Sequence, residues 1–175
     1  MKFGEKTIKK HSVYEGKIIN VRCDEAELPD GRPCKRELVE HLGGAAVVCE
    51  FGGKIAFVRQ YRYAYGEELL EIPAGKLEKG EDPMLAAMRE LSEETGFRAE
   101  RLSLLTVLYP SPGYTNEKIY LYAAHGVTRG ESRLDEGEFL DLEMIPAEEA
   151  FAMAQNGVLR DAKSVAALLL YKSIR

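Results

Sequence analysis

Residues 75–97 read GKLEKGEDPMLAAMRELSEETGF, and this stretch decides the fold. Asp82 followed by Pro83 is typical of a helix start, because aspartate caps the first N–H groups and proline lacks the N–H that would stay unpaired. Gly96 stands where a left-handed residue ends a helix. The stretch therefore predicts a helix that begins at Pro83 and ends before Gly96. One apolar stripe of this helix is expected to face a sheet: Met84, Met88 and Leu91.

Three glutamates gather on another side of the predicted helix. Glu90, Glu93 and Glu94 fall on an arc of about 100° and repel one another by a few tenths of a kcal/mol per pair. Arg89 can pair with Glu93 four residues on, but one cation cannot neutralise three carboxylates. A solvated acidic face is the common explanation of such a cluster. Oxygen ligands grouped in this way also suit Mg²⁺ or Mn²⁺ bound together with substrate phosphates.

The same stretch carries a family signature. Gly75, five residues, Glu81, seven residues and then RELSEETGF match the signature box of the Nudix hydrolases at nine positions. The chain thus resembles that family, and the match favours the metal site over the solvated face. The resemblance implies an α/β/α sandwich and hydrolysis of a diphosphate linked to another moiety. It also implies the metal ligands: Glu90 and Glu94 as the principal pair, Glu93 as a further one, and the backbone carbonyl of Ala74.

Three further box residues are expected to support these ligands. Gly75 fits a place where the chain bends and approaches metal and phosphates without a Cβ. Arg89 is expected to hold the loop and its glutamates rather than to bind phosphate directly. Glu81 either orients a metal ligand from behind or forms a simple salt bridge.

Segments outside the box resemble the ADP-ribose pyrophosphatase branch of the family. Pro112 lies 16 residues beyond Gly96, and a loop of this kind marks the substrate side in that branch. A plain turn between strands is the alternative, since Pro-Gly needs no ligand. The residues of this predicted substrate loop are Ser111, Pro112, Gly113 and Glu117.

Two arginine segments extend the resemblance. The run RQYR at residues 59–62 matches an Arg-Gln-x-Arg pattern, in which Arg62 would bind the substrate phosphates. Arg36 and Glu37 match an Arg-Glu pair that contacts substrate from the partner subunit. A surface ion pair is the alternative reading of that pair.

The catalytic base is expected in the acidic run at residues 135–138, where three of four residues are acidic. Such a run is usually a solvated loop, but its place before the strand predicted at 139–145 matches the acidic loop of the ADP-ribose pyrophosphatases. Either Glu136 or Glu138 would deprotonate the water while the other helps to hold a metal. Both assignments stay open.

Composition bounds the remaining possibilities. At 175 residues and a net charge of −5, the chain favours one sizeable domain and carries no basic footprint for nucleic acid. The longest apolar stretch, 165–171, is too short for a bilayer, and no N-terminal signal region is seen. An odd number of scattered cysteines indicates neither disulfides nor zinc, so we expect a cytoplasmic protein.

Strand and helix patterns predict an α/β fold with outer helices and a mixed sheet between them. A small N-terminal antiparallel strand pair is expected at 14–23 and 36–41, around a turn at 28–31. We therefore expect N-terminal strands over residues 1–42, which contact substrate and a homodimer partner, and a Nudix hydrolase domain over 43–175.

The sequence thus predicts metal-dependent cleavage of ADP-ribose, or a related ADP-sugar, into AMP and ribose 5-phosphate. Another nucleoside diphosphate sugar, such as GDP-mannose, is the rival substrate. A Nudix fold kept as a non-catalytic ligand sensor is the rival outside the enzymes. The intact box glutamates favour catalysis.

Overall fold

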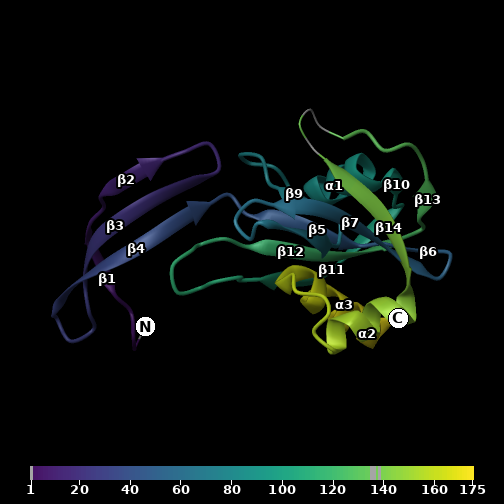
Figure 1. Cartoon of the computed structure of the whole chain (residues 1–175). Helices are drawn as coiled ribbons and strands as arrows, with labels where there is room; N and C mark the ends of the chain where they lie inside the picture. Colours follow the sequence, from purple (N-terminus) through teal and green to yellow (C-terminus); the bar gives the residue numbers. More distant parts are fainter. Residues whose placement is uncertain (1, 135–136, 138) are drawn as a thin grey trace. The chain divides into compact units, whose positions relative to one another are not determined.

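The computed structural model describes residues 2–134, 137 and 139–175 (Figure 1). The chain forms two compact units, and each consists of two separate segments of the sequence. The first comprises Met1–Leu42 together with Tyr109–Lys118, and the second comprises Gly43–Leu108 together with Ile119–Arg175.

The first unit is built on one antiparallel sheet of four strands. Its strands are β1 (Lys6–Lys9), β2 (Ser12–Glu15), β3 (Ile19–Glu27) and β4 (Pro33–His41). The expected pair is present as β3 and β4, and β1 and β2 extend it along β3. The strand expected over 14–23 is split in two, because the chain turns after Glu15 and Gly16 N–H donates to the carbonyl of Ile19 at 3.0 Å.

The second unit contains two four-stranded sheets. The first sheet runs in the order β11 (Arg101–Leu108), β12 (Ile119–His125), β5 (Gly44–Val48) and β9 (Ala74–Lys76). Within it, β12 and β5 are parallel and the other pairs are antiparallel, so the predicted mixed sheet is confirmed. The second sheet is antiparallel and contains β14 (Leu140–Pro146), β7 (Lys54–Arg62), β6 (Glu50–Phe51) and β8 (Glu67–Glu71). A short pair joins β10 (Phe97–Arg98) to β13 (Thr128–Arg129).

Helices cover both faces of the central strand β5 in the second unit (Figure 1). Because side chains of a strand alternate between its faces, Ala46 and Val48 join one core with α2 (Ala147–Gln155) and α3 (Ala162–Ile174). Ala45 and Val47 join the other core with α1 (Pro83–Thr95). The α/β/α sandwich expected from the sequence is therefore confirmed.

Helix α1 begins and ends as its sequence predicts. Asp82 Oδ1 accepts from Met84 N–H at 2.8 Å, and Gly96 adopts a left-handed φ of 73°. The predicted apolar stripe is partly wrong, because Met84 is 40% exposed although Leu91 is fully buried. The small side chains of Ala86 and Ala87 are fully buried instead. Alanine lets a helix approach closely, so these positions displace the longer methionine from the contact.

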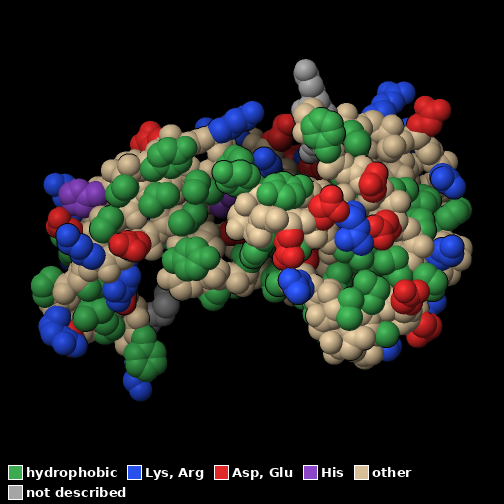
Figure 2. Space-filling view, in the orientation of Figure 1, with side chains coloured by type: hydrophobic (Ala, Val, Ile, Leu, Met, Phe, Trp, Pro, Cys, Tyr) green, Lys and Arg blue, Asp and Glu red, His purple; other side chains and the backbone are tan. Residues whose placement is uncertain are grey.

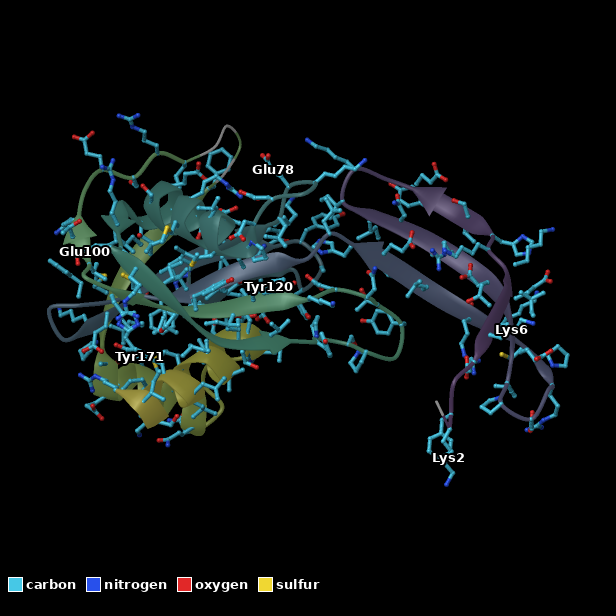
Figure 3. The ribbon with its side chains drawn as sticks, turned by 180° about the vertical axis from the view of Figure 1, so that it is seen from behind. Lys2, Lys6, Glu78, Glu100, Tyr120 and Tyr171 are labelled. Carbon is cyan, nitrogen blue, oxygen red and sulfur yellow. The ribbon has the colours of Figure 1, made fainter. Side chains whose placement is uncertain are left out.

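Helix α3 attaches the C-terminal part of the chain to the sheets. Tyr171, labelled in Figure 3, donates to Glu50 Oε2 at 3.0 Å. The three cysteines are free thiols. Across the described residues, none of the helices combines the length and the apolar character that a bilayer crossing requires.

Candidate active site

The site centres on a corner where strand β9 passes against helix α1. A Cβ added to Gly75 would lie 1.8 Å from Glu90 Oε1 and 1.9 Å from its carboxyl carbon. Real Cβ atoms never come so close, so the Glu90 carboxylate occupies the space that any other residue at position 75 would fill. Glycine is required here for this close approach rather than for a special φ.

A second box glutamate is tied to the backbone of the same corner. Glu94 is 4% exposed, and its Oε2 accepts from Ala74 N–H at 2.9 Å. Glu90 is 8% exposed. Carboxylates buried to this extent are costly unless they are paired or bind a cation. Two of the buried carboxylates among the described residues, those of Glu90 and Glu94, therefore lie beside one backbone corner.

Arg89 is the cation that Glu81, Glu90 and Glu93 share. Its Nη1 donates to Glu90 Oε1 at 2.7 Å and to Glu93 Oε2 at 3.0 Å, the latter being the pair expected four residues apart. Its Nε donates to Glu81 Oε1 at 3.0 Å, and its Nη2 reaches the Lys76 carbonyl at 3.4 Å. Arg89 thus joins helix, loop and strand.

These contacts shift the pKa values of both partners. Hydrogen bonds, first from Arg89 and then from the backbone N–H of Glu78, lower the pKa of Glu81. The hydrogen bond to Glu81, followed by the charge of Glu90, raises the pKa of Arg89. Both groups therefore stay charged at neutral pH, and the salt bridge persists there.

The donor set suits a divalent cation, although the side chains are not arranged around one. In the described part of the chain, no three His, Cys, Asp or Glu side chains stand close enough together to hold a metal ion. Glu90 and Glu93 turn toward Arg89 instead. Hard carboxylate oxygens of this kind are the preferred ligands of Mg²⁺ and Mn²⁺. A bound metal ion would replace part of the contact that Glu90 and Glu93 make with Arg89.

Arg62 lies beside this acidic corner. Its Nε and Nη2 form a fork with Glu71, at 2.6 and 2.7 Å from the two carboxylate oxygens. The hydrogen bond to Glu71 raises the pKa of Arg62, and the charges of Glu71, Asp161 and Glu94 add to this effect. The Arg62 guanidinium therefore lies within electrostatic range of Glu94, and its place in the site stays a prediction.

Comparison with known proteins now assigns the family. The model of the NUDIX domain matches residues 21–168. The chain belongs to the Nudix domain family.

Related proteins carry differing names. The methanol dehydrogenase activator of Bacillus methanolicus is 43% identical, over 95% of this chain and 91% of its own length. The ADP-ribose pyrophosphatase of Bacillus subtilis (strain 168) is 40% identical, over 94% of this chain and 90% of its own length. A crystal structure of an ADP compounds hydrolase superposes with a TM-score of 0.84 at 23% identity. It covers 97% of this chain and 93% of that chain, and it confirms the fold.

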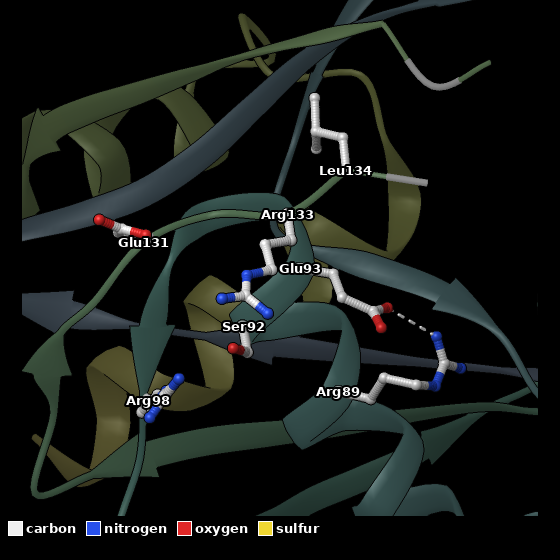
Figure 4. Close-up of a pocket in the computed structure, with 7 residues that line it drawn as sticks. All are labelled: Arg89, Ser92, Glu93, Arg98, Glu131, Arg133 and Leu134. Carbon is white, nitrogen blue, oxygen red and sulfur yellow. Dashed lines mark hydrogen bonds and ion pairs between the residues drawn. The ribbon is translucent and has the colours of Figure 1, made fainter. Parts of the chain in front are cut away.

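A cavity of about 470 Å³ adjoins the Nudix helix α1 (Figure 4). Its lining consists of Arg89, Ser92, Glu93, Arg98, Glu131, Arg133 and Leu134. Arg133 N–H donates to the Glu93 carbonyl at 3.0 Å, and Gly130 N–H donates to the Gly96 carbonyl at 2.7 Å. The segment that leads toward the acidic run is thereby bonded to the C-terminal turn of the Nudix helix.

The predicted substrate loop belongs to the first unit. Tyr114 O accepts from Val39 N–H at 2.7 Å, so the loop joins strand β4. Glu117 lies 3.4 Å from His41 Nδ1, and Asn116 Oδ1 accepts from His41 N–H at 2.9 Å. The remaining loop residues, Ser111, Pro112 and Gly113, form the turn before these contacts. The loop is therefore hydrogen-bonded to β4 of the first unit.

Arg36 and Glu37 lie on strand β4 of the same unit. Arg36 does not pair with Glu37, because adjacent strand residues point to opposite faces. It forms a fork with Glu5 instead, at 2.8 and 2.5 Å. Arg36 thus makes a surface ion pair, as the alternative reading held, although its partner is Glu5, and the predicted substrate contact stays a prediction. Glu136 and Glu138, the predicted bases, lie outside the described residues.

Sequence reasoning missed Glu71 and Lys163, which join Arg62 in one ion-pair cluster. Glu71 is 2% exposed and binds both Arg62 and Lys163. Glu71 carried only a weak signal, as a glutamate between the apolar residues 69–70 and 72–73. Lys163 carried none, because it lies 92 residues from Glu71 along the chain.

Replacing Gly75 by alanine is expected to destabilise the fold and displace Glu90. The added methyl group would overlap the Glu90 carboxylate, and overpacking of this kind costs about 1–3 kcal/mol. Urea unfolding measures the loss of stability, and kcat reports the displaced carboxylate. The neighbouring exposed variant Lys76→Ala is the control, with a change within about 0.5 kcal/mol. A wild-type free energy of unfolding for Gly75→Ala would refute the close approach.

Proposed function

We propose that this chain is a divalent-metal-dependent hydrolase of ADP-ribose, or a related ADP-sugar, that yields AMP and ribose 5-phosphate. One observation carries the hydrolase: the corner at which Glu90 fills the space beside Gly75 and Glu94 binds the Ala74 backbone. The ADP-ribose pyrophosphatase of Bacillus subtilis, similar over nearly the whole chain, supports the choice of substrate.

Glu90 and Glu94 are the principal ligands in this proposal, with Glu93 and the Ala74 carbonyl completing the set. Mg²⁺ is the proposed metal, with Mn²⁺ as a substitute. When bound, such an ion neutralises phosphate oxygens and lowers the pKa of a coordinated water. Arg89 and Glu81 hold the glutamates in place through the contacts at Nη1 and Nε. Gly75 keeps the corner open.

The remaining roles concern water and substrate. Glu136 or Glu138 takes the proton from the attacking water, and the other assists at the metal. Arg62 binds the diphosphate with its guanidinium, which suits phosphate oxygens. Arg36 and Glu37, on the N-terminal strands, contact the substrate from the partner subunit. The loop at 111–117 also contacts the substrate. A cytoplasmic location is proposed as well, and the three free thiols support it.

We expect the protein to form a homodimer through its N-terminal strands. Exposed apolar side chains such as Val13, Tyr14 and Ile18, at 66, 57 and 54%, leave this unit in need of cover. Figure 2 shows hydrophobic side chains gathered on one face of the unit. Light scattering at micromolar concentration should give twice the chain mass. A fully active monomer, or full activity after removal of residues 1–35, would contradict the dimer.

A substrate panel tests the proposed function. The protein is incubated with Mg²⁺ and ADP-ribose, another ADP-sugar or GDP-mannose, and the products are separated and identified. We expect the highest kcat/KM with ADP-ribose and equal amounts of AMP and ribose 5-phosphate. Rapid cleavage of GDP-mannose with inert ADP-ribose would defeat the substrate assignment. Binding without cleavage of any member of the panel would favour the ligand sensor.

A further inference from the structure

A group of charges around the buried Glu71 connects Arg62 to the last helix of the chain. Glu71 is 2% exposed, and its two oxygens receive Nε and Nη2 of Arg62. Lys163, on the first turn of α3, also binds Glu71 and reaches Asp161 Oδ2 at 3.0 Å. Two cations and two carboxylates thus balance in charge. One carboxylate buried between two cations can persist, whereas one buried alone would be protonated.

Helix α3 fixes the neighbouring backbone as well. Ser164 Oγ, which is fully buried, accepts from Ile72 N–H at 2.8 Å, and the same hydroxyl donates to Asp161. Ile72 precedes Pro73 and the corner residue Ala74. The first turn of α3 therefore holds both the side chain of Glu71 and the backbone of the next residue.

The fork with Glu71 leaves one end of the Arg62 guanidinium available. Nε and Nη2 point at Glu71, while Nη1 donates to no acceptor among the residues that the structure describes. The Arg62 side chain is 39% exposed, so an incoming anion can reach it. A planar guanidinium held along one edge keeps a fixed orientation for a phosphate at the opposite edge.

We propose that Glu71 and Lys163 are positioning residues, which hold Arg62 so that its Nη1 end meets the substrate diphosphate. Glu71 acts through the fork, and Lys163 acts by keeping the Glu71 carboxylate charged and fixed. The inference rests on the proposed function, because it assigns a diphosphate to Arg62. It adds the C-terminal helix to the parts of the fold that determine activity.

A double-mutant cycle on Arg62 and Glu71 tests the inference. Glu71→Gln keeps the volume but turns an amide N–H₂ toward one guanidinium donor, so the fork is lost. Misplacing a substrate contact in this way lowers kcat/KM on ADP-ribose by on the order of 10²-fold. Arg62→Ala should lower it to a similar level, and the double variant should be no worse than Arg62→Ala alone, because both act through one contact.

The matched control is Glu67→Gln. Glu67 lies on the same strand and pairs with Arg160 at 3.2 Å, but this pair is exposed. Its kcat/KM should equal that of the wild type. An unchanged kcat/KM for Glu71→Gln would overturn the proposal. So would losses that multiply in the double variant, since Glu71 would then act independently of Arg62.

Nucleotide binding separates this inference from the proposed function. Calorimetry with Mg²⁺ and ADP, or GDP if a GDP-sugar is cleaved, reports the contact between Arg62 and the diphosphate whichever sugar is preferred. We expect Kd to rise about tenfold or more, equally for Arg62→Ala and Glu71→Gln. Equal Kd values for Glu71→Gln and wild type would overturn the positioning role. If ADP-ribose is not cleaved but Kd rises equally in both variants, the substrate assignment alone is wrong.

Lys163→Met keeps the test decisive if Glu71→Gln fails to fold. Glu71 then still has Arg62 as a partner, so the loss of the Lys163 cation is tolerated more easily. We expect kcat/KM to fall by about tenfold as the fork loosens, whereas Arg160→Met, at an exposed neighbouring cation, leaves it unchanged. Wild-type kcat/KM and Kd for folded Lys163→Met would overturn the role of the helix.

Discussion

Glu94→Gln is expected to remove most of the turnover and leave the fold intact. The glutamine oxygen can still accept from Ala74 N–H, the 2.9 Å bond that ties α1 to the corner. What disappears is the negative charge that a divalent cation requires. Loss of a metal ligand costs several kcal/mol of transition-state stabilisation, so kcat should fall by orders of magnitude. Steady-state kinetics and thermal unfolding measure the two effects separately.

The control for this variant is Glu78→Gln, in the loop before α1. Glu78 is exposed and contributes its backbone N–H, not its carboxylate, to the cluster around Glu81. Turnover and melting temperature should match the wild type. A folded Glu94→Gln protein with near wild-type kcat would remove Glu94 from the metal site and with it the principal ligand pair.

Of Glu136→Gln and Glu138→Gln, at least one should lower kcat on ADP-ribose by about 10²–10⁴-fold, the usual effect of losing a general base. KM should stay within a few-fold, because the base acts on water rather than on the substrate. Glu100→Gln, at an exposed carboxylate between β10 and β11, should change neither constant. If both substitutions leave kcat at the wild-type value, the base lies elsewhere in the chain.

Hydrolysis in labelled water identifies the phosphorus that the activated water attacks. Hydrolysis in ¹⁸O-water should place the label in one product, either AMP or ribose 5-phosphate, because one water attacks one phosphorus. Label divided between both products would contradict a single base that directs a single water.

Local sequence patterns predicted the features that depend on interactions within a few residues of the chain. Asp82 and Gly96 fixed both ends of α1, since a cap and a left-handed residue act within one turn. The buried face of α1 was less predictable. The helical period does not show how closely α1 packs on the sheet, and this distance decides whether Met84 or Ala86 is buried. The split after Glu15 likewise depends on a turn that forms within a strand-like pattern.

The candidate site shows the same division. The box placed Glu90 and Glu94 on one helix and Gly75 before it, and these three do meet at one corner. The partners of Arg62 could not be predicted, because Glu71 is chosen by tertiary packing and Lys163 arrives from the C-terminal helix. Long-range ion pairs follow the fold and not the spacing of residues along the chain.

The most direct test of a metal-dependent diphosphate hydrolase is a metal titration of the wild-type protein. The protein is treated with EDTA and dialysed, and AMP release from ADP-ribose is followed as Mg²⁺ is added back. We expect no release in EDTA and a rate that rises with Mg²⁺ to saturation, with the full wild-type kcat at the plateau. Undiminished AMP release in excess EDTA would contradict the metal site at Glu90 and Glu94.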